Sequence, residues 1–364
     1  MKFEFTGEQK MVDDVVVNRI RATRDFVLNR FADDKSNGAC LVEIKKGDLG
    51  GWLENMNNLS QDDLDDSAWV MGDACVYGDA RVSGSAIVCD SAKVYGSACV
   101  QDFALIKNEA QVCGNASIKH YATISGHAKV EGAQVSDRAL ICGHADVYNV
   151  TIEDDVEIYG NAYVHNDGDI DFFVLGCAVV CDNAKIVSSA SGAYIYIYGK
   201  VAENAQIWND VDVGHNATVM GYSKIYGHID LKDDAIICFP EYDEMMCLYS
   251  DVPAVLGRNA YILDERDLVA FDLSFSHDKL TVSFYPDKER RIYMTIDDEG
   301  CGSPAWQIDN EGDLKQYIFD WVYRCYYGYD CGASLEATSG LLIEMSRYAK
   351  SYFKQLESEK AKRR

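Results

Sequence analysis

A six-residue repeat runs through more than half of the chain and restricts its fold more than any other feature. Eleven β-branched residues follow one another at a spacing of six. They are Val70, Val76, Val82, Val88, Val94, Val100, Ile106, Val112, Ile118, Ile124 and Val130. An alanine stands two positions before each of them, and Gly, Asp, Asn or His stands two positions after. Because these last residue types tolerate a positive φ, each hexad predicts a short strand that ends in a tight corner.

Three hexads predict one triangular coil of about 18 residues, and successive coils stack as parallel strands about 4.8 Å apart. The repeat continues one residue out of phase from Val135, weakens, and returns to strict spacing between Ile195 and Ile237. A helix is excluded, because apolar residues at spacings of two and six form no 3.6-residue face. The sequence therefore predicts a mainly β protein in which residues 68–262 form a solenoid of about ten coils.

The hexads resemble the bacterial hexapeptide-repeat superfamily, whose fold is the left-handed parallel β-helix. More narrowly, residues 46–52, 58–61 and 68–70 are similar to the segment that leads into the coils of YdcK-like proteins, which are frequent in phages and prophages. The resemblance implies a left-handed parallel β-helix in a protein of phage or prophage type. In the acyltransferase branch of the superfamily glycine tends to follow the β-branched residue directly, whereas here it comes one residue later.

Both ends of a coil stack need a cover, since an open end exposes apolar side chains and unpaired strand edges. Residues 1–67 are predicted to form an N-terminal cap in which Trp52 and Leu53 plug the first coil. Residues 263–364 are predicted to form a small α+β domain. Its predicted strands span 268–275, 280–285 and 291–296, and its predicted helices span 313–327 and 334–355.

The charge of the chain favours some partners and excludes others. With 34 basic and 59 acidic residues the net charge is -25, which repels phosphates, so we expect no direct nucleic-acid binding and no docking on an anionic membrane. We find neither a long apolar run nor a signal-peptide core, and expect a cytoplasmic protein, in the host cytoplasm if it is phage-encoded. The 13 cysteines form no CxxC pair, which favours free thiols and predicts no metal site.

One corner column contains the candidate catalytic residues. Residues about 18 apart lie on adjacent coils, which places Glu109, His127 and His144 about 5 Å apart. Hexapeptide acyltransferases use a single His as general base, so these residues are the candidates if the chain is an enzyme, with acetyl-CoA or another acyl-CoA as cofactor. The alternative is that the histidines are ordinary corner residues, because Asn115 and Asn161 occupy the same position in similar repeats, and then no cofactor is expected.

Outward-facing apolar residues form a second candidate set, because a contiguous exposed apolar column indicates an interface with a partner or with a second copy. Two such columns are Trp69, Ile87 and Leu105, and Trp208 and Tyr226. The alternative is that the N-terminal segment or the C-terminal domain folds over them.

A long insertion between Ile237 and Leu256 adds three further binding candidates. It replaces a single six-residue step and carries Tyr242, Met245 and Met246. Loops that leave a rigid solenoid often carry binding residues. A loop folded onto the C-terminal domain is the alternative.

The sequence thus leads to two hypotheses of different classes. The first is a non-enzymatic phage or prophage accessory protein, an oligomeric acidic β-helix scaffold that binds a host or phage macromolecule, with a protein as the expected partner. An inhibitory or anti-defence role belongs to this hypothesis, because rows of carboxylates on a rod would mimic duplex DNA; solubility of a long β surface is the alternative explanation of the acidic residues. The second hypothesis is a hexapeptide-type acyltransferase with a His base.

Overall fold

The computed structural model describes most of the chain. The described residues are 1–30, 40–61, 66–168, 171–189, 194–240, 248–256, 260–263, 265–272, 280–298, 306–308 and 332–363. The protein is mainly β, with 46% strand and 10% helix, and it contains a parallel β-solenoid of about nine turns. The chain divides into two compact units, Met1–Glu203 and Asn204–Arg364.

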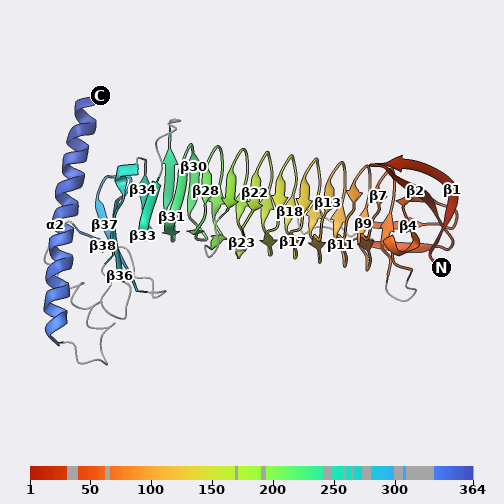
Figure 1. Ribbon diagram of the computed structural model, residues 1–364, viewed down its shortest axis with the longest axis horizontal. Helices are drawn as coiled ribbons and strands as arrows, with labels where there is room; N and C mark the ends of the chain where they lie inside the picture. Colours follow the sequence, from red (N-terminus) through yellow and green to blue (C-terminus); the bar gives the residue numbers. More distant parts are fainter. Residues whose placement is uncertain are drawn as a thin grey trace. The chain divides into compact units, whose positions relative to one another are not determined.

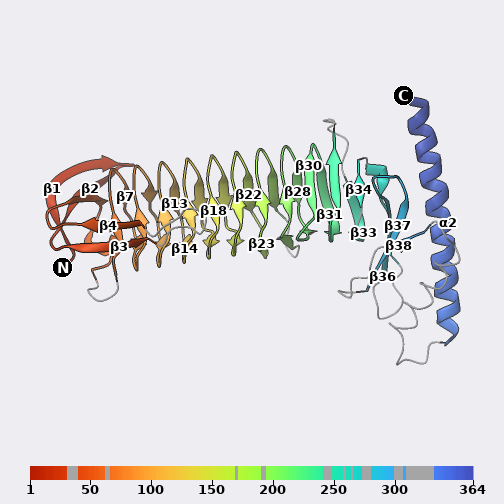
Figure 2. The same cartoon turned by 180° about the vertical axis from the view of Figure 1, so that it is seen from behind.

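Antiparallel strand pairs precede the first coil, and the last of these strands pairs with it. Leu53 lies in register with Val76 of the first coil, so the last cap strand continues directly into the solenoid. The buried Lys2 ammonium contacts the carboxylate of Asp66 at 2.9 Å and holds the first strand in place. The cap strands lie together at the start of the coils (Figure 1, Figure 2). The cap elements are β1 (Phe3–Val12), β2 (Val15–Ala22), β3 (Phe26–Arg30), β4 (Cys40–Ile44), β5 (Leu49–Leu53) and η1 (Met56–Asn58).

The coils of the first unit have three faces, each a column of parallel strands. The first face contains β7 (Cys75–Val76), β10 (Lys93–Val94), β13 (Gln111–Cys113), β16 (Lys129–Glu131), β19 (Asp146–Tyr148), β22 (Tyr163–Asn166) and β25 (Lys185–Ser188). The second contains β8 (Arg81–Val82), β11 (Cys99–Val100), β14 (Ser117–Ile118), β17 (Gln134–Val135), β20 (Thr151–Ile152), β23 (Phe172–Val174) and β26 (Ile195–Ile197). The third contains β6 (Trp69–Val70), β9 (Ile87–Val88), β12 (Leu105–Ile106), β15 (Thr123–Ile124), β18 (Leu140–Ile141), β21 (Glu157–Ile158), β24 (Val179–Val180) and β27 (Lys200–Val201).

The core of these coils is a set of aligned aliphatic side chains, which confirms the predicted stacking. Val76, Val94 and Val112 lie in register on adjacent coils and are fully buried. The corner residues have a positive φ, which explains the predominance of glycine there. At Gly84, for example, an added Cβ would lie only 2.8 Å from the backbone nitrogen of Asp102 on the next coil.

The length of a coil varies, and the variation is absorbed at the corners. Val147 pairs with Val164 after 17 residues, whereas Val164 pairs with Ile186 after 22. In both cases the inward side chains stay in register. The structure has about nine turns, close to the expected ten.

The second unit contains further solenoid strands followed by an α+β region. The solenoid strands are β28 (Gln206–Trp208), β29 (Val211–Val213), β30 (Thr218–Gly221), β31 (Lys224–Leu231), β32 (Ile236–Phe239), β33 (Leu248–Leu256) and β34 (Tyr261–Ile262). After η2 (Glu265–Asp267), a four-stranded sheet packs on a helix. Its elements are β35 (Val269–Asp272), β36 (Leu280–Pro286), β37 (Ile292–Asp298), β38 (Trp306–Gln307) and α2 (Gly332–Arg363).

Three of the strands and one helix of this region agree with the predicted ranges, and the predicted helix at 313–327 lies outside the described residues. Phe284 and Met294 of the sheet pack against Leu342 and Phe353 of the helix in one buried cluster.

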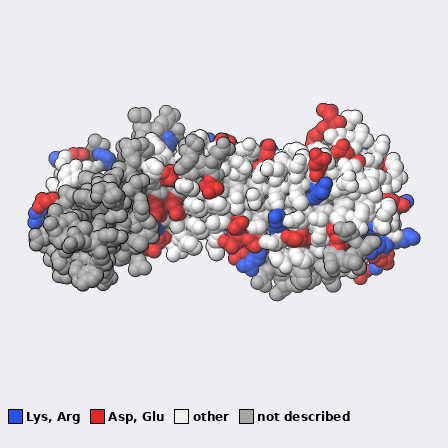
Figure 3. Space-filling model, turned by 60° about the horizontal axis from the view of Figure 1, so that its bottom comes forward, with Lys and Arg blue, Asp and Glu red and all other residues white. Residues whose placement is uncertain are grey.

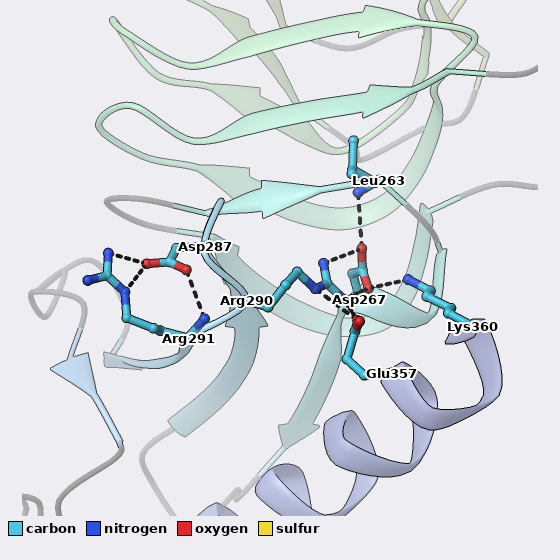
Figure 4. A network of polar contacts seen from close by, with 7 residues as sticks. All are labelled: Leu263, Asp267, Asp287, Arg290, Arg291, Glu357 and Lys360. Carbon is cyan, nitrogen blue, oxygen red and sulfur yellow. Dashed lines mark hydrogen bonds and ion pairs between the residues drawn. The ribbon is translucent and has the colours of Figure 1, made fainter. Parts of the chain in front are cut away.

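A buried carboxylate joins three elements of the second unit (Figure 4). The fully buried Asp267 accepts hydrogen bonds from the Arg290 guanidinium at 2.7 and 3.2 Å and from the Lys360 ammonium at 3.1 Å. It also accepts one from the backbone N–H of Leu263 at 3.1 Å. Arg290 donates in addition to Glu357 of α2 at 2.9 Å. Asp267 therefore ties the residues after β34, the β36–β37 turn and the C-terminal part of α2 together.

We expect the inward side chains of the stacked core to contribute more to the free energy of unfolding than the outward side chains do. We expect Ile124→Ala to lower the free energy of unfolding by about 2–5 kcal/mol, because it removes a fully buried side chain between two neighbouring coils. The matched control is Thr123→Ala on the same strand, whose side chain points outward and is expected to change stability by less than about 0.5 kcal/mol. Urea unfolding followed by circular dichroism measures both. Equal effects of the two changes would contradict the inward assignment.

Loss of the Asp267 carboxylate is expected to loosen α2. Asp267→Ala should lower the free energy of unfolding of the second unit by about 2–4 kcal/mol, because Arg290 and Lys360 then lose a buried counter-charge. The helical circular-dichroism signal during urea unfolding reports the change. Glu289→Ala, which removes an exposed partner of Arg291, is the control and should be nearly neutral. A wild-type unfolding curve for Asp267→Ala would show that this network does not hold the helix.

Candidate functional site

The predicted corner column of Glu109, His127 and His144 is present, and its side chains face solvent. The two imidazoles stack with centroids 4.7 Å apart and planes at 6°. His127 Nδ1 lies 3.4 Å from Glu109 Oε2. The side chains of His127 and Glu109 are 51% and 66% exposed, and His144 is exposed as well. The coils thus bring the three residues together and leave their side chains exposed among the described residues.

The first predicted apolar column is aligned but not exposed, so the expectation of an open apolar stripe is wrong there. Trp69, Ile87 and Leu105 lie in register on adjacent coils and are only 0%, 7% and 5% exposed. The ring of Phe26, on cap strand β3, packs edge-on against Trp69 at 5.2 Å. The backbone at Gly50 also lies so close that an added Cβ would come within 2.8 Å of the Trp69 ring. The N-terminal segment therefore covers the start of this column.

The second predicted apolar column lies in the second unit. Trp208 of β28 is in register with Tyr226 of β31, and the Tyr226 side chain is exposed. The three candidates of the long insertion, Tyr242, Met245 and Met246, lie outside the described residues.

One corner of the coils carries an ordered set of charges. It lies between the second and third faces and contains Asp102, His120, Asp137 and Asp154, all at positive φ. Asp102 Oδ2 accepts a hydrogen bond from the His120 backbone N–H at 3.1 Å, and Asp137 Oδ2 accepts one from the Asp154 N–H at 3.3 Å. Asp154 Oδ2 in turn accepts from the Gly176 N–H at 3.0 Å. This ladder holds the carboxylates at fixed positions along the corner.

Aromatic and charged side chains flank the ladder. The rings of Phe103 and Tyr121 stack at 5.1 Å with planes at 4°, and Tyr121 is exposed. Arg138 makes two hydrogen bonds of 2.6 Å to Asp155. We call the residues Asp102, Asp137, Glu153, Asp154 and Asp155 the acidic corner. Arg138 pairs with Asp155 and His120 lies against Asp137, so these five residues carry more carboxylates than the cations shown bonded to them.

The environment of Asp137 keeps it ionised. Partial burial raises the pKa of the Asp137 carboxyl. Two hydrogen bonds, from the Asp154 N–H and the Ser136 hydroxyl, act in the opposite direction, as does the nearby His120 ring. Overall the pKa of Asp137 lies below its ordinary value.

Acidic side chains also gather in several groups on the face drawn in Figure 3, where Lys and Arg are fewer. The surface of the described residues therefore carries an excess of acidic side chains, in agreement with the net charge of -25.

A second pair of carboxylates lies on adjacent strands of the second unit. Asp212 of β29 is in register with Asp230 of β31, which pairs with Lys232 at 2.9 Å. Burial, followed by the neighbouring charge of Asp230, raises the pKa of Asp212 to about 7, although Lys232 opposes the shift. One oxygen of Asp212 is buried and has no hydrogen-bond partner among the described residues. Asp212 is therefore half-protonated near neutral pH.

The described part of the chain contains no group of three or more His, Cys, Asp or Glu side chains arranged to hold a metal ion. No described helix is long and apolar enough to span a membrane. No protein-family model matches the chain, and no curated protein matches it either. The in-register coils define the class of the protein as a parallel β-solenoid.

Because the pKa of Asp212 is raised in the folded chain, we expect the free energy of unfolding to depend on pH. Its pKa is about 7 in the folded state and about 3.9 in an unfolded chain, so its contribution to stability is fully present below pH 4 and is lost as the pH rises through 7. We expect Asp212→Asn to stabilise the chain by about 1–3 kcal/mol at pH 8 and to have little effect at pH 4. Unfolding curves at both pH values test this. Asp233→Asn, at an exposed corner, is the control, and a pH-independent effect of Asp212→Asn would disprove the assignment.

Proposed function

We propose that this chain is a non-enzymatic binding scaffold whose acidic corner docks onto a basic protein surface. The observation that carries the proposal is the backbone ladder that fixes the carboxylates of Asp137 and Asp154 on adjacent coils and that of Asp102 two coils before Asp137. Side chains that are ordered before binding lose little conformational freedom when a partner arrives, and this favours affinity.

The chemistry of the corner indicates which partner it fits. Carboxylates form strong charge-assisted hydrogen bonds with guanidinium and ammonium groups. The exposed Tyr121 beside them offers an aromatic surface on which an arginine stacks. A net charge of -25 steers basic proteins toward the rod and repels nucleic acids and anionic lipids.

The biological setting that we propose follows from the resemblance of residues 46–52 to YdcK-like proteins. We place the protein in the cytoplasm of a phage-infected or lysogenic cell, as an accessory protein that assembles into a homo-oligomer. The Trp208 and Tyr226 column is the proposed contact between copies, because Tyr226 is exposed and large apolar columns favour interfaces. An inhibitory role fits this scaffold, since aligned carboxylates would occupy a basic surface that normally faces an anionic ligand.

The exposure of the histidine column favours the binding scaffold over the acyltransferase. A general base for acyl transfer works best in a site that excludes water and holds the acyl-CoA. His127 is half exposed and His144 is exposed in the single chain. We therefore assign the two histidines to the corner structure.

The test removes two of the five carboxylates of the acidic corner without breaking its ladder. Asn accepts the same backbone hydrogen bond, as Asn108 does from the Gly126 N–H at 3.3 Å, so Asp137→Asn with Asp154→Asn removes two charges and preserves the fold. The matched control is Asp90→Asn with Asp182→Asn, which makes the same change in the ladder of another corner.

Tagged chains are crosslinked in cells, the partner is identified by mass spectrometry, and its binding is then measured with purified proteins at low and high salt. We expect a basic partner whose affinity falls at least tenfold for the acidic-corner variant and with rising salt, and stays at the wild-type value for the control variant. Equal binding by both variants, or a partner with an acidic contact surface, would overturn the proposal.

A further inference from the structure

A histidine stands within the row of acidic residues at the acidic corner. His120 lies on the coil between Asp102 and Asp137, at the same corner and with the same positive φ. The carboxylates of Asp102, Asp137 and Asp154 each accept a hydrogen bond from a backbone N–H of the next coil. At His120 the ring takes this part, because the Asp137 N–H donates to His120 Nδ1 at 3.4 Å. An imidazole therefore replaces one acidic acceptor in the ladder.

The same ring nitrogen also contacts the Asp137 side chain. His120 Nδ1 lies 3.0 Å from Asp137 Oδ1, and both side chains are about half exposed. The other oxygen of this carboxylate, Oδ2, accepts from the Asp154 N–H at 3.3 Å and from the Ser136 hydroxyl at 3.0 Å. Oδ1 is therefore the oxygen of Asp137 that the ladder leaves to a cationic partner, and His120 Nδ1 lies against it.

One nitrogen cannot serve both contacts at once. A neutral imidazole has one nitrogen that donates and one that accepts, whereas both nitrogens of an imidazolium donate. His120 Nδ1 without a proton accepts from the Asp137 N–H and completes the ladder. Nδ1 with a proton donates to Asp137 Oδ1 instead and leaves that ladder bond unmade. The protonation state of the ring thus decides which of the two contacts is formed.

We infer that His120 makes the acidic corner pH-dependent and weakens its binding of basic partners as the pH falls. This inference rests on the proposed function of the corner. The neutral ring carries its proton on Nε2, which leaves Asp137 Oδ1 open to a guanidinium or ammonium group. When Nδ1 takes up one proton from solvent, the ring gains a positive charge that repels the partner, and its new N–H occupies Oδ1. Histidine is the side chain that ordinarily changes its charge between pH 5 and 8.

The charged groups around the ring support this exchange of contacts. Those described next to it are Asp102 on the coil before, Asp137 and Arg138 on the coil after, and Lys119 beside it in the chain. Arg138 makes two hydrogen bonds of 2.6 Å to Asp155, so its charge is paired. The pKa of Asp137 lies below its ordinary value, so this carboxylate is ionised over the pH range in which an imidazole takes up its proton. The imidazolium therefore forms beside a charged oxygen.

The coil keeps its backbone hydrogen bonds in both protonation states. The Phe103 N–H donates to the His120 carbonyl at 2.9 Å, and the Tyr121 N–H donates to the Asp137 carbonyl at 2.8 Å. Neither bond involves the ring. The exchange therefore changes one charge and one acceptor oxygen of a corner that stays in place.

The first experiment follows the ring in the full chain without a partner, by NMR of uniformly 15N-labelled protein. We expect Nδ1 of His120 to carry no proton at pH 8, and the Asp137 amide signal to shift as the pH is lowered to 5.5. In His120→Asn this shift should be lost, and the fold should be kept, because Asn108 accepts a ladder bond at positive φ. His127→Asn, which changes an exposed histidine at another corner, is the control and should keep the shift. A proton on Nδ1 at pH 8, or the same response in all three chains, would overturn the inference.

The second experiment measures the binding of a hexa-arginine peptide at low salt, read at the Asp137 and Asp154 amide signals so that this corner alone is monitored. We expect the wild-type affinity to be about three- to fivefold higher at pH 8 than at pH 5.5, as one added charge at about 4 Å would give in water. The difference should disappear in His120→Asn and persist in His127→Asn. Equal affinities of the wild type at both pH values contradict the regulation alone. Absence of any peptide-induced shift at either pH contradicts the proposed function of the corner, and the regulation with it.

Discussion

The stacking of buried aliphatic side chains in register between coils is the interaction on which the rest of the structure depends. Val76, Val94 and Val112 each bury their whole side chain between aliphatic neighbours on adjacent strands. Each such burial contributes about 1.5–3 kcal/mol, and the repetition of one small interaction stabilises the whole stack. Because the inward residues keep their register when a coil grows to 22 residues, as between Val164 and Ile186, the corners are free to vary.

The corners therefore carry the chemistry of this protein. A non-glycine residue at positive φ costs roughly 1–2 kcal/mol. A hydrogen bond from a backbone N–H to a charged side chain contributes about 1.5–3 kcal/mol, which offsets that cost at Asp102, Asp137 and Asp154. The ladder thus allows carboxylates where glycine would otherwise be needed. The same hydrogen bonds that stabilise the corner also align its charges for a partner.

The repeat predicts most of the fold because a period of six leaves one way to bury the β-branched residues. It also predicts which side chains share a column, and the stacking of His127 on His144 follows from it. It does not predict what covers a column. The contact of Phe26 with Trp69 joins residues far apart in the sequence, and no local pattern indicates it. The acidic corner was within reach of sequence reasoning, because Asp137 occupies a position where glycine is usual.

The stiffness of the core bears on how the proposed acidic corner would act. The corner residues 153–155 directly follow Ile152, which is fully buried and packed in register with Val174 of the next coil. A conformational response to binding requires an element with two arrangements of similar free energy, and a close-packed interior resists such rearrangement. The proposed docking of a basic protein therefore relies on carboxylates that are already in place, and it needs no change in the coils that carry them.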